Sequence, residues 1–300
     1  MSRSKNAIAL LITVMFVIVI TVAIGLGLKQ VNVAGQEVKN ENFMYQSSII
    51  IEDVMKILKN SPDLKRVADG NSSSDFFTFI SQASYIPFAS SGIDIILQVS
   101  SARGKFNPKQ LENNETRVDI VREYFTNNRI NSEYMNLLLD NVSRVKADNS
   151  YNSAIFNENP YLFRDYIASS KHLKVINDFY TKEYNDNSLK NIDFEKLFYF
   201  SDSNETKIDL NYATPEVWEM IAGVSKERAS ELHAGGGFYE TIDDIGLSDT
   251  ELERVQKFNV STQEKFIFVN VEIMKEKSKA KISFEYDIKN NKGSNFVYEI

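Results

Sequence analysis

The sequence contains no cysteine and only two histidines, His172 and His233. Without cysteine the chain cannot form disulfides, thiolate metal sites or a cysteine nucleophile. With only two histidines, the chain is also a poor candidate for a histidine-rich zinc site or a Ser-His-Asp triad. The G-x-S-x-G, P-loop and H-E-x-x-H patterns are missing as well. The sequence therefore predicts a protein that is not an enzyme.

Positive charge is in short supply too. The chain has 34 lysines and arginines against 41 aspartates and glutamates, which gives a net charge of −7. Such a chain has no general attraction to phosphate backbones, so the composition disfavours a nucleic-acid partner. Apolar residues make up 43 % of the 300 residues, which is enough to bury the core of one large domain or two small ones.

Proline is scarce, and none occurs before Pro62. The first part of the chain instead holds a stretch without charge from Ala7 to Leu28. This stretch exceeds the ~7–15 apolar residues of a signal peptide and matches the ~20 residues of a membrane-spanning helix. Because Arg3 and Lys5 precede it, the N-terminus is expected in the cytoplasm and the remaining chain outside. We expect a single-pass membrane protein with most of the chain outside the cytoplasm.

Helical signals continue beyond the apolar stretch. An approximate apolar stripe runs on through Val31, Val33, Val38, Phe43, Ile49, Ile50, Val54, Met55 and Ile57. The sequence predicts one long helix from about residue 8 to residue 60. Its first part, 8–28, is expected in the membrane, and its second part, 29–62, in the periplasm. The alternatives for this segment are a cleaved export signal and a plain anchor.

Strands are predicted on both sides of a long helical block. Residues 92–99, 265–273, 280–288 and 295–300 are rich in β-branched and aromatic residues. In the third of these, Ile282, Phe284, Tyr286 and Ile288 alternate with Lys281, Ser283, Glu285 and Asp287, which predicts one buried and one wet face. The order of the elements favours an α+β fold with one antiparallel sheet, formed by 63–115 and 261–300, packed on the long helix. Residues 116–200 are then an inserted all-α domain.

Residues 201–260 hold a predicted helical hairpin. Thr214-Pro215-Glu216 is a strong helix start, and Gly223 lets the chain turn before Ser225 caps a second helix. The inward residues are expected to be Val217, Met220, Ile221, Ala229 and Leu232. Such a hairpin can present backbone N–H groups to a phosphate. Acidic residues surround its Lys226 and Arg228, so a packing module is favoured over a DNA-binding hairpin.

An acidic segment follows the hairpin. Asp243, Asp244 and Asp249 stand close to Glu251 and Glu253. In one interpretation they cap helices, with Asp249 and Glu251 in the first turn of a helix. In the other they hold calcium outside the cell, where it is plentiful, although their spacing does not match an EF-hand loop.

Three stretches together resemble a known family. They are KNAIALLITVMFV (5–17), SSARGKFNPKQL (100–111) and KIDLNYATPEVWEMIAGVSKERASEL (207–232), and NPYLFRDYIASSKHLKVI (159–176) adds weaker support. The chain resembles the K-type minor pseudopilins (GspK) of bacterial type II secretion, and the resemblance spans nearly its whole length. It implies a pilin-like fold whose inserted helical domain contains a helix-hairpin-helix, or SAM-like, module.

The resemblance also implies a function and its partners. With the I- and J-type minor pseudopilins, the chain would initiate and cap a periplasmic pseudopilus built on an inner-membrane assembly platform. Prepilin peptidase would cut the leader, residues 1–7, between Ala7 and Ile8 and methylate Ile8. Ala7 stands where the family usually has glycine. Ile12 falls at mature position five, where other pseudopilins carry a glutamate and this family does not.

The resemblance leaves the cofactor and two other functions open. Calcium is implied by the family, and Asp243, Asp244 and Asp249 are the candidate ligands. The main alternative function is a minor pilin of a competence or type IV pilus. The more distant one is a membrane-anchored DNA-binding protein.

Overall fold

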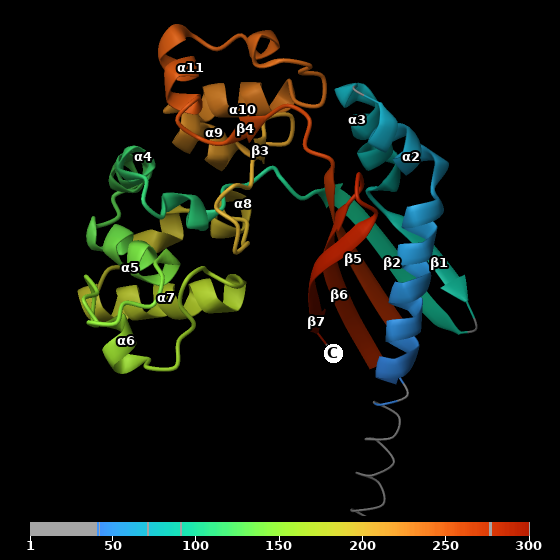
Figure 1. Ribbon diagram of the computed structural model, residues 1–300, viewed down its shortest axis with the longest axis horizontal. Coiled ribbons are helices and arrows are strands. Elements are labelled where there is room, and N and C mark those ends of the chain that lie inside the picture. The colour runs from blue at the N-terminus through green and yellow to red at the C-terminus, as the bar shows by residue number, and fades with distance from the viewer. Residues whose placement is uncertain (1–40, 42, 71, 91, 276–277, 300) are drawn as a thin grey trace, which may run out of the picture.

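The computed structural model of the protein describes residues 41, 43–70, 72–90, 92–275 and 278–299. They form two units with separate hydrophobic cores, a sheet unit and a helical unit (Figure 1). The predicted membrane span and the processing residues Ala7, Ile8 and Ile12 lie outside the described residues. Among the helices that the structure does describe, none has the length and hydropathy needed to cross a bilayer.

The sheet unit is built on a five-stranded antiparallel sheet. The strand order is β1-β2-β5-β6-β7, with the bounds β1 Ile86–Ser90, β2 Ile93–Ser101, β5 Phe266–Lys275, β6 Ser278–Asp287 and β7 Lys292–Glu299. The neighbours β2 and β5 come from opposite sides of the helical block. The prediction of a single antiparallel sheet with the helical block inserted into it is therefore confirmed.

A helix over residues 43–60 covers one face of this sheet (Figure 1). Its buried side chains recur at spacings of three and four residues, which places them on one side of the helix. They are Phe43, Ser47, Ile51, Val54 and Leu58. They pack in one core with the inward residues of β2, β5 and β6. The predicted stripe was right for Phe43 and Val54 but wrong for Ile49 and Ile57, which are exposed on other sides of the helix.

Two short helices lead from this helix into the sheet. Ser61 ends the helix over 43–60 and caps α2 (Pro62–Asp69), whose first residue is a proline. The helix ends at residue 60, where the sequence predicted its end, and the segment bound drawn at residue 62 falls on the first residue of α2. α3 (Ser73–Ala83) follows, and β1 comes directly after it. The sequence did not predict β1, because this edge strand is only five residues long and contains Pro87.

The helical unit holds the remaining elements. They are η1 Pro108–Leu111, α4 Glu115–Asn127, α5 Glu133–Val142, α6 Ile155–Glu158, α7 Ser170–Tyr184, η2 Ser188–Asn191, α8 Phe194–Leu197, β3 Ile208–Asp209, α9 Pro215–Ala222, α10 Lys226–Ala234, η3 Ile242–Ile245, α11 Asp249–Val255 and β4 Val260–Ser261. The short strands β3 and β4 pair in parallel. The stretch predicted to be helical, 116–200, does contain helices, of which α4, α5 and α7 are the longest.

One hydrophobic core joins the two predicted helical parts. The segments 116–200 and 201–260 both contribute to it, so they are a single unit and not two. The predicted start of this unit at residue 116 was also wrong. Phe106 and Leu111 are fully buried in the helical core, so the sheet unit ends with β2 at Ser101.

Candidate functional site: the joint between the two units

The three aspartates considered for calcium do not form a cluster. All three are exposed. Asp244 Oδ2 accepts hydrogen bonds from the backbone N–H of Thr241 at 2.7 Å and from its hydroxyl at 3.0 Å. Asp249 lies in the first turn of α11, so the capping interpretation of this residue is confirmed. Within the described ranges, no group of three or more histidine, aspartate or glutamate side chains is placed to hold a metal ion.

The predicted helical hairpin is present as α9 and α10. Thr214 and Ser225 cap the two helices, and Gly223 turns between them with φ of 69°. The five residues predicted to face inward are buried. The hairpin's Arg228 lies 3.6 Å from Glu231 and 3.5 Å from Glu251. This arginine is therefore partly neutralised by the protein's own carboxylates, which weakens the case for a phosphate site.

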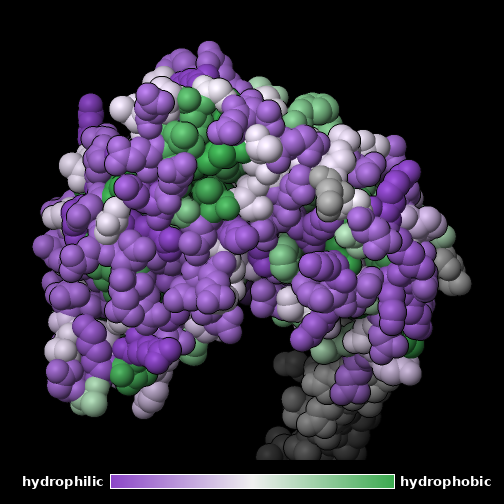
Figure 2. Space-filling view, turned by 45° about the horizontal axis from the view of Figure 1, so that its top comes forward, coloured by the Kyte–Doolittle hydropathy of each residue, from purple (hydrophilic) through white to green (hydrophobic). Residues whose placement is uncertain are grey.

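A set of buried polar side chains lies where the two units meet. The chain passes from the sheet unit to the helical unit after β2 and returns before β5. Figure 2 shows the units as two lobes that are joined at one end, with a hollow between them. Around the crossing segments, Arg103, Asp209, Asn211 and Glu285 are each no more than 6 % exposed. The sequence did not single out Arg103, Asn211 or Glu285 as a site residue.

A buried ion pair links the outgoing segment to the sheet. The guanidinium of Arg103 donates two hydrogen bonds to Glu285 in β6, at 2.7 and 2.6 Å. The hydroxyl of Tyr199, from the helical unit, donates to the same carboxylate. Arg103 also lies 4.0 Å from the ring centre of Phe266. The predicted wet face of β6 was therefore wrong at Glu285, because the helical unit covers that part of the sheet.

Asn211 uses its whole side-chain amide to tie three segments together. Its nitrogen donates to the carbonyls of Tyr239 and Thr262, both at 2.8 Å. Its oxygen accepts from the N–H groups of Gly237 at 2.8 Å and of Tyr239 at 2.9 Å. All the hydrogen-bonding capacity of the amide is satisfied, so the residue fixes the Gly-rich loop against the returning segment.

Replacing Asn211 with alanine is expected to lower the free energy of unfolding by about 2 kcal/mol, because it leaves buried backbone groups without partners. Urea titration followed by circular dichroism measures this loss. Asn270→Ala is the matched control, because Asn270 on the outer face of the sheet donates one side-chain bond, to Gln98. Equal losses in the two variants would contradict the role given to Asn211.

The loop after α10 docks on the first turn of α3. The Oγ of Ser73 donates to the carbonyl of Tyr239 at 3.0 Å and to that of Thr262 at 3.3 Å. The carboxylate of Glu240 accepts from the backbone N–H of Ser73 at 3.2 Å. The ring of Phe238 lies 4.9 Å from that of Phe77, between centres. The Gly-rich stretch is thus the predicted loop after a helix, and it serves as a docking loop.

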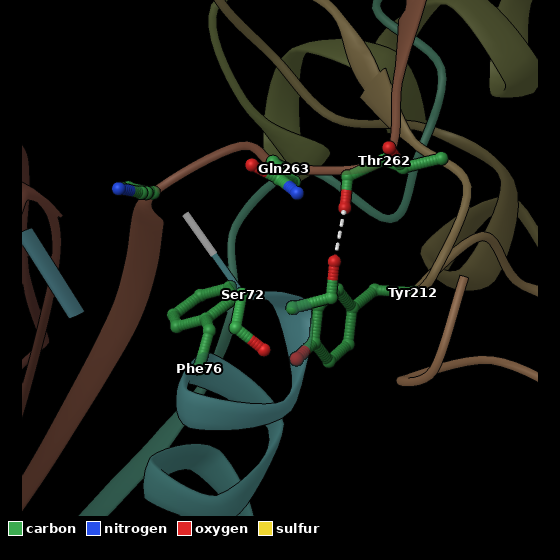
Figure 3. Close-up of a pocket in the computed structure, with 7 residues that line it drawn as sticks. Ser72, Phe76, Tyr212, Thr262 and Gln263 are labelled. Atoms are coloured by element: carbon green, nitrogen blue, oxygen red, sulfur yellow. Dashed lines mark hydrogen bonds between the residues drawn. The ribbon is translucent and has the colours of Figure 1, made fainter. Parts of the chain in front are cut away.

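The space left at this contact is small. Figure 3 shows Ser72, which caps α3, and Phe76 of α3 facing Tyr212 and Thr262 of the helical unit across it. The enclosed volume is about 10 Å³. Pockets for small molecules are roughly 300–1,000 Å³, so this cavity holds no such ligand. The joint is therefore a packed contact and not a binding pocket.

Asp209 holds both crossing segments at once. Its backbone N–H donates to the carbonyl of Arg103 in the outgoing segment at 2.8 Å. Its Oδ2 accepts from the N–H of Glu264 in the returning segment at 2.9 Å, and its Oδ1 accepts from the N–H of Asn211 at 3.0 Å. Burial raises the pKa of this carboxyl to about 7, although the two N–H bonds favour the ionised form.

Apolar side chains flank the helix over 43–60 on both sides. Ile86 and Phe88 of β1 lie opposite the buried Leu97 and Ile95, so they share the helix-covered face of the sheet. Tyr298 of β7 lies opposite Ile282 and shares the same face at the other edge. The side chains of β1 and β7 named here are 38–52 % exposed. They form apolar rims beside the helix, suited to packing against other helices.

Comparison with known proteins supports the fold. No family model matches the sequence, and no curated protein matches it. Among solved structures, the chain is similar to one in the GspK–GspI–GspJ complex of the type 2 secretion system of enterotoxigenic Escherichia coli. The TM-score is 0.55 at 12 % identity, and the match covers 87 % of this chain and 97 % of that chain. The chain therefore has a GspK-like fold, as the sequence resemblance implied.

Proposed function

We propose that this chain is a K-type minor pseudopilin that initiates and caps the periplasmic pseudopilus of a type II secretion system. Its partners in the tip complex would be I- and J-type minor pseudopilins. The observation that carries the proposal is the arrangement of the sheet unit. An N-terminal helix lies on a five-stranded antiparallel sheet, and a large helical unit is inserted between two neighbouring strands. The fold shared with a chain of the GspK–GspI–GspJ complex supports it.

The position of the helical unit fits a capping role. Figure 1 places α10 and α11 near the end of the sheet unit that carries α3, opposite the start of the helix over 43–60, and α4 to α8 beside the sheet unit. If the segment before residue 41 anchors the chain in the membrane, this end points away from the bilayer. The helices at that end would hinder the addition of a further subunit beyond it. The apolar rims beside the helix would then pack against the subunits that follow.

The membrane location and the compartment proposed for the chain rest on its sequence. The uncharged stretch from Ala7 to Leu28, preceded by Arg3 and Lys5, fits a single span of the inner membrane with the bulk of the chain in the periplasm. Prepilin peptidase and the assembly platform would be its further partners. In the same proposal, the hairpin of α9 and α10 is a helix-hairpin-helix, or SAM-like, module that serves packing.

Mass spectrometry of the mature N-terminus tests this proposal. Cells that contain the prepilin peptidase are expected to yield a chain that starts at N-methylated Ile8. Ala7→Phe is expected to abolish the cut, because a bulky side chain replaces a small one directly before it. Ala23→Phe, within the same uncharged stretch, is the matched control and should be processed normally. An intact Met1 or Ser2, or a cut near residue 25, would overturn the proposal.

Co-purification then separates the two kinds of filament. The full-length protein, extracted in mild detergent, is expected to carry I- and J-type pseudopilins with it. Recovery of type IV pilus or competence subunits in their place would assign the chain to that machinery. Arg228 and Arg254 lie within 4 Å of the protein's own carboxylates, so the exported part is expected not to bind DNA at about 100 mM salt.

A further inference from the structure

The joint contains a buried carboxyl group that has no part in the proposed assembly surfaces. We propose that Asp209 is a pH-sensitive latch, which holds the two units together when its carboxyl is neutral and favours opening of the joint when it is ionised. The inference rests on the geometry of the joint and does not depend on the proposed function.

The position of Asp209 is the first argument for a latch. It is the residue through which β3 contacts both segments that cross between the units. One backbone bond reaches the carbonyl of Arg103, and one side-chain bond comes from Glu264. The residue is 1 % exposed. A movement that separates β3 from the two crossing segments would break these bonds and expose the carboxyl to water.

The charged groups around Asp209 do not neutralise it. The guanidinium of Arg103 is bound to Glu285 on the other side of the outgoing segment. The nearby Lys207 lies 4.0 Å from the carboxylate of Glu264, and the charge of that carboxylate disfavours ionisation of Asp209. In the returning segment, Lys265 donates to the carbonyl of Ala68 at the end of α2.

Two further polar groups face the same region. Tyr212 follows Asp209 in the chain, and both burial and the Asp209 charge raise the pKa of its phenol. Ser261 of β4 lies opposite Asp209 in the parallel pair but carries no charge. Among the described residues, two backbone N–H groups hydrogen-bond to the ionised carboxyl, and they act against the cost of burial.

The direction of the pH effect follows from linkage. In the closed joint the pKa of Asp209 is raised to about 7, whereas a carboxyl exposed to water in an opened joint has its ordinary pKa of about 3.9. The neutral carboxyl therefore stabilises the closed joint fully below about pH 4. This stabilisation is lost as the pH rises through 7. Between about pH 4 and pH 7, Asp209 loses its proton when the joint opens. The free energy of opening therefore falls as the pH rises.

Hydrogen exchange of the full-length protein in lipid nanodiscs tests the latch. Peptides that cover residues 207–213 and 262–266 report opening of the joint, and a peptide from β6 reports the sheet. After correction for the chemical exchange rate, the opening equilibrium constant of the joint is expected to rise at least about tenfold between pH 5 and pH 7. The sheet peptide is expected to keep its protection, because the buried carboxylate of β6, Glu285, is paired with the guanidinium of Arg103.

The variant Asp209→Asn removes the titration and keeps the shape of the side chain. Its opening constant is expected to be the same at pH 5 and pH 7. Asp287→Asn, in which the aspartate bonds to Asn290 at the surface, is the matched control and should behave as the wild type. The same pH dependence in the wild type and in Asp209→Asn would overturn the proposal.

A direct titration keeps the proposal testable if Asp209→Asn does not fold. Carbon-13 labelling of the aspartate carboxyls in the wild type reports the ionisation of Asp209 itself. A carboxyl at this position that titrates near 7 supports the latch. One that is fully ionised at pH 5 would overturn it, because the closed joint would then gain nothing from the neutral form.

Discussion

Replacing Arg103 with methionine is expected to lower the free energy of unfolding by about 3–5 kcal/mol. The two side chains of its ion pair with Glu285 are only 7 % and 6 % exposed. Methionine keeps the volume of the side chain but leaves the Glu285 carboxylate buried without its cation. The hydroxyl of Tyr199 still donates to that carboxylate, but one neutral donor does not replace a two-bond guanidinium. Urea titration of the exported part measures the loss.

A second arginine provides the matched control for this prediction. Arg66 lies 2.6 Å from Asp63, but both side chains are more than half exposed. Arg66→Met is expected to cost less than about 1 kcal/mol, since solvent screens such a pair. The double variant Arg103→Met with Glu285→Leu should recover part of the loss, because no buried charge remains. Similar small losses in both single arginine variants would show that the buried pair does not hold the joint.

Replacing Gly104 with alanine is expected to cost about 3 kcal/mol through overpacking. A Cβ at this position would lie 2.1 Å from the backbone oxygen of Tyr212. The obstacle is main chain, so no side-chain rotation relieves it. The carbonyl of Gly104 also accepts from the N–H of Thr214 at 3.1 Å, and this bond holds the outgoing segment close to the start of α9. Thermal and urea unfolding of the variant measure the loss.

Gly246→Ala separates crowding from backbone conformation. Gly246 has φ of +68° and no atom within 4 Å of the added Cβ, so its substitution should cost only about 1–2 kcal/mol of conformational strain. Gly104 has the opposite combination, because its cost comes from crowding. If Gly104→Ala were no more destabilising than Gly246→Ala, the prediction would be contradicted. The close approach of the outgoing segment to Tyr212 would then not contribute to the free energy of unfolding.

The contacts of Gly104 also give a physical reason for one stretch of the family resemblance. In SSARGKFNPKQL, the arginine enters the buried pair and the glycine allows the close approach. Phe106 is fully buried in the helical core. Asn107 caps η1 by accepting from the N–H of Lys109, and its amide nitrogen donates to the carbonyl of Ser203 at 2.8 Å. The stretch is thus the start of the helical unit, although its sequence suggested an extended piece of the sheet.

Periodicity was enough to predict the parts of the fold that bury one face. β6 alternates apolar and polar residues, and α9 begins with a capping threonine followed by proline, so both elements were visible in the sequence. β1 was not, because a five-residue strand with Pro87 has no period to detect. The boundary at residue 115 was wrong because the segment from Phe106 to Leu111 has no helical period of its own and is buried by partners distant in the sequence.

The joint was not predictable from the sequence by the same reasoning. In the sequence, the buried residues Asp209 and Glu285 cannot be told from acidic residues on the solvent-exposed face of a strand. What distinguishes them is the second unit lying over them, and this depends on contacts between residues that are far apart in the sequence. A buried arginine with a matching carboxylate carries no local signal either. The processing residues Ala7 and Ile8 remain predictions, since they lie outside the described part of the chain.

The neighbouring positions of β2 and β5 have a consequence for how the chain folds. Roughly 160 residues separate these strands, and closing so long a loop in an unfolded chain is costly and slow. The helical unit brings its two ends together, and Ala102 donates a backbone bond to Phe266 at 3.0 Å across them. If the helical unit folds first, it presents β2 and β5 to each other as the two arms of a hairpin. The order of folding would then run from the middle of the chain outward, with the sheet completed last.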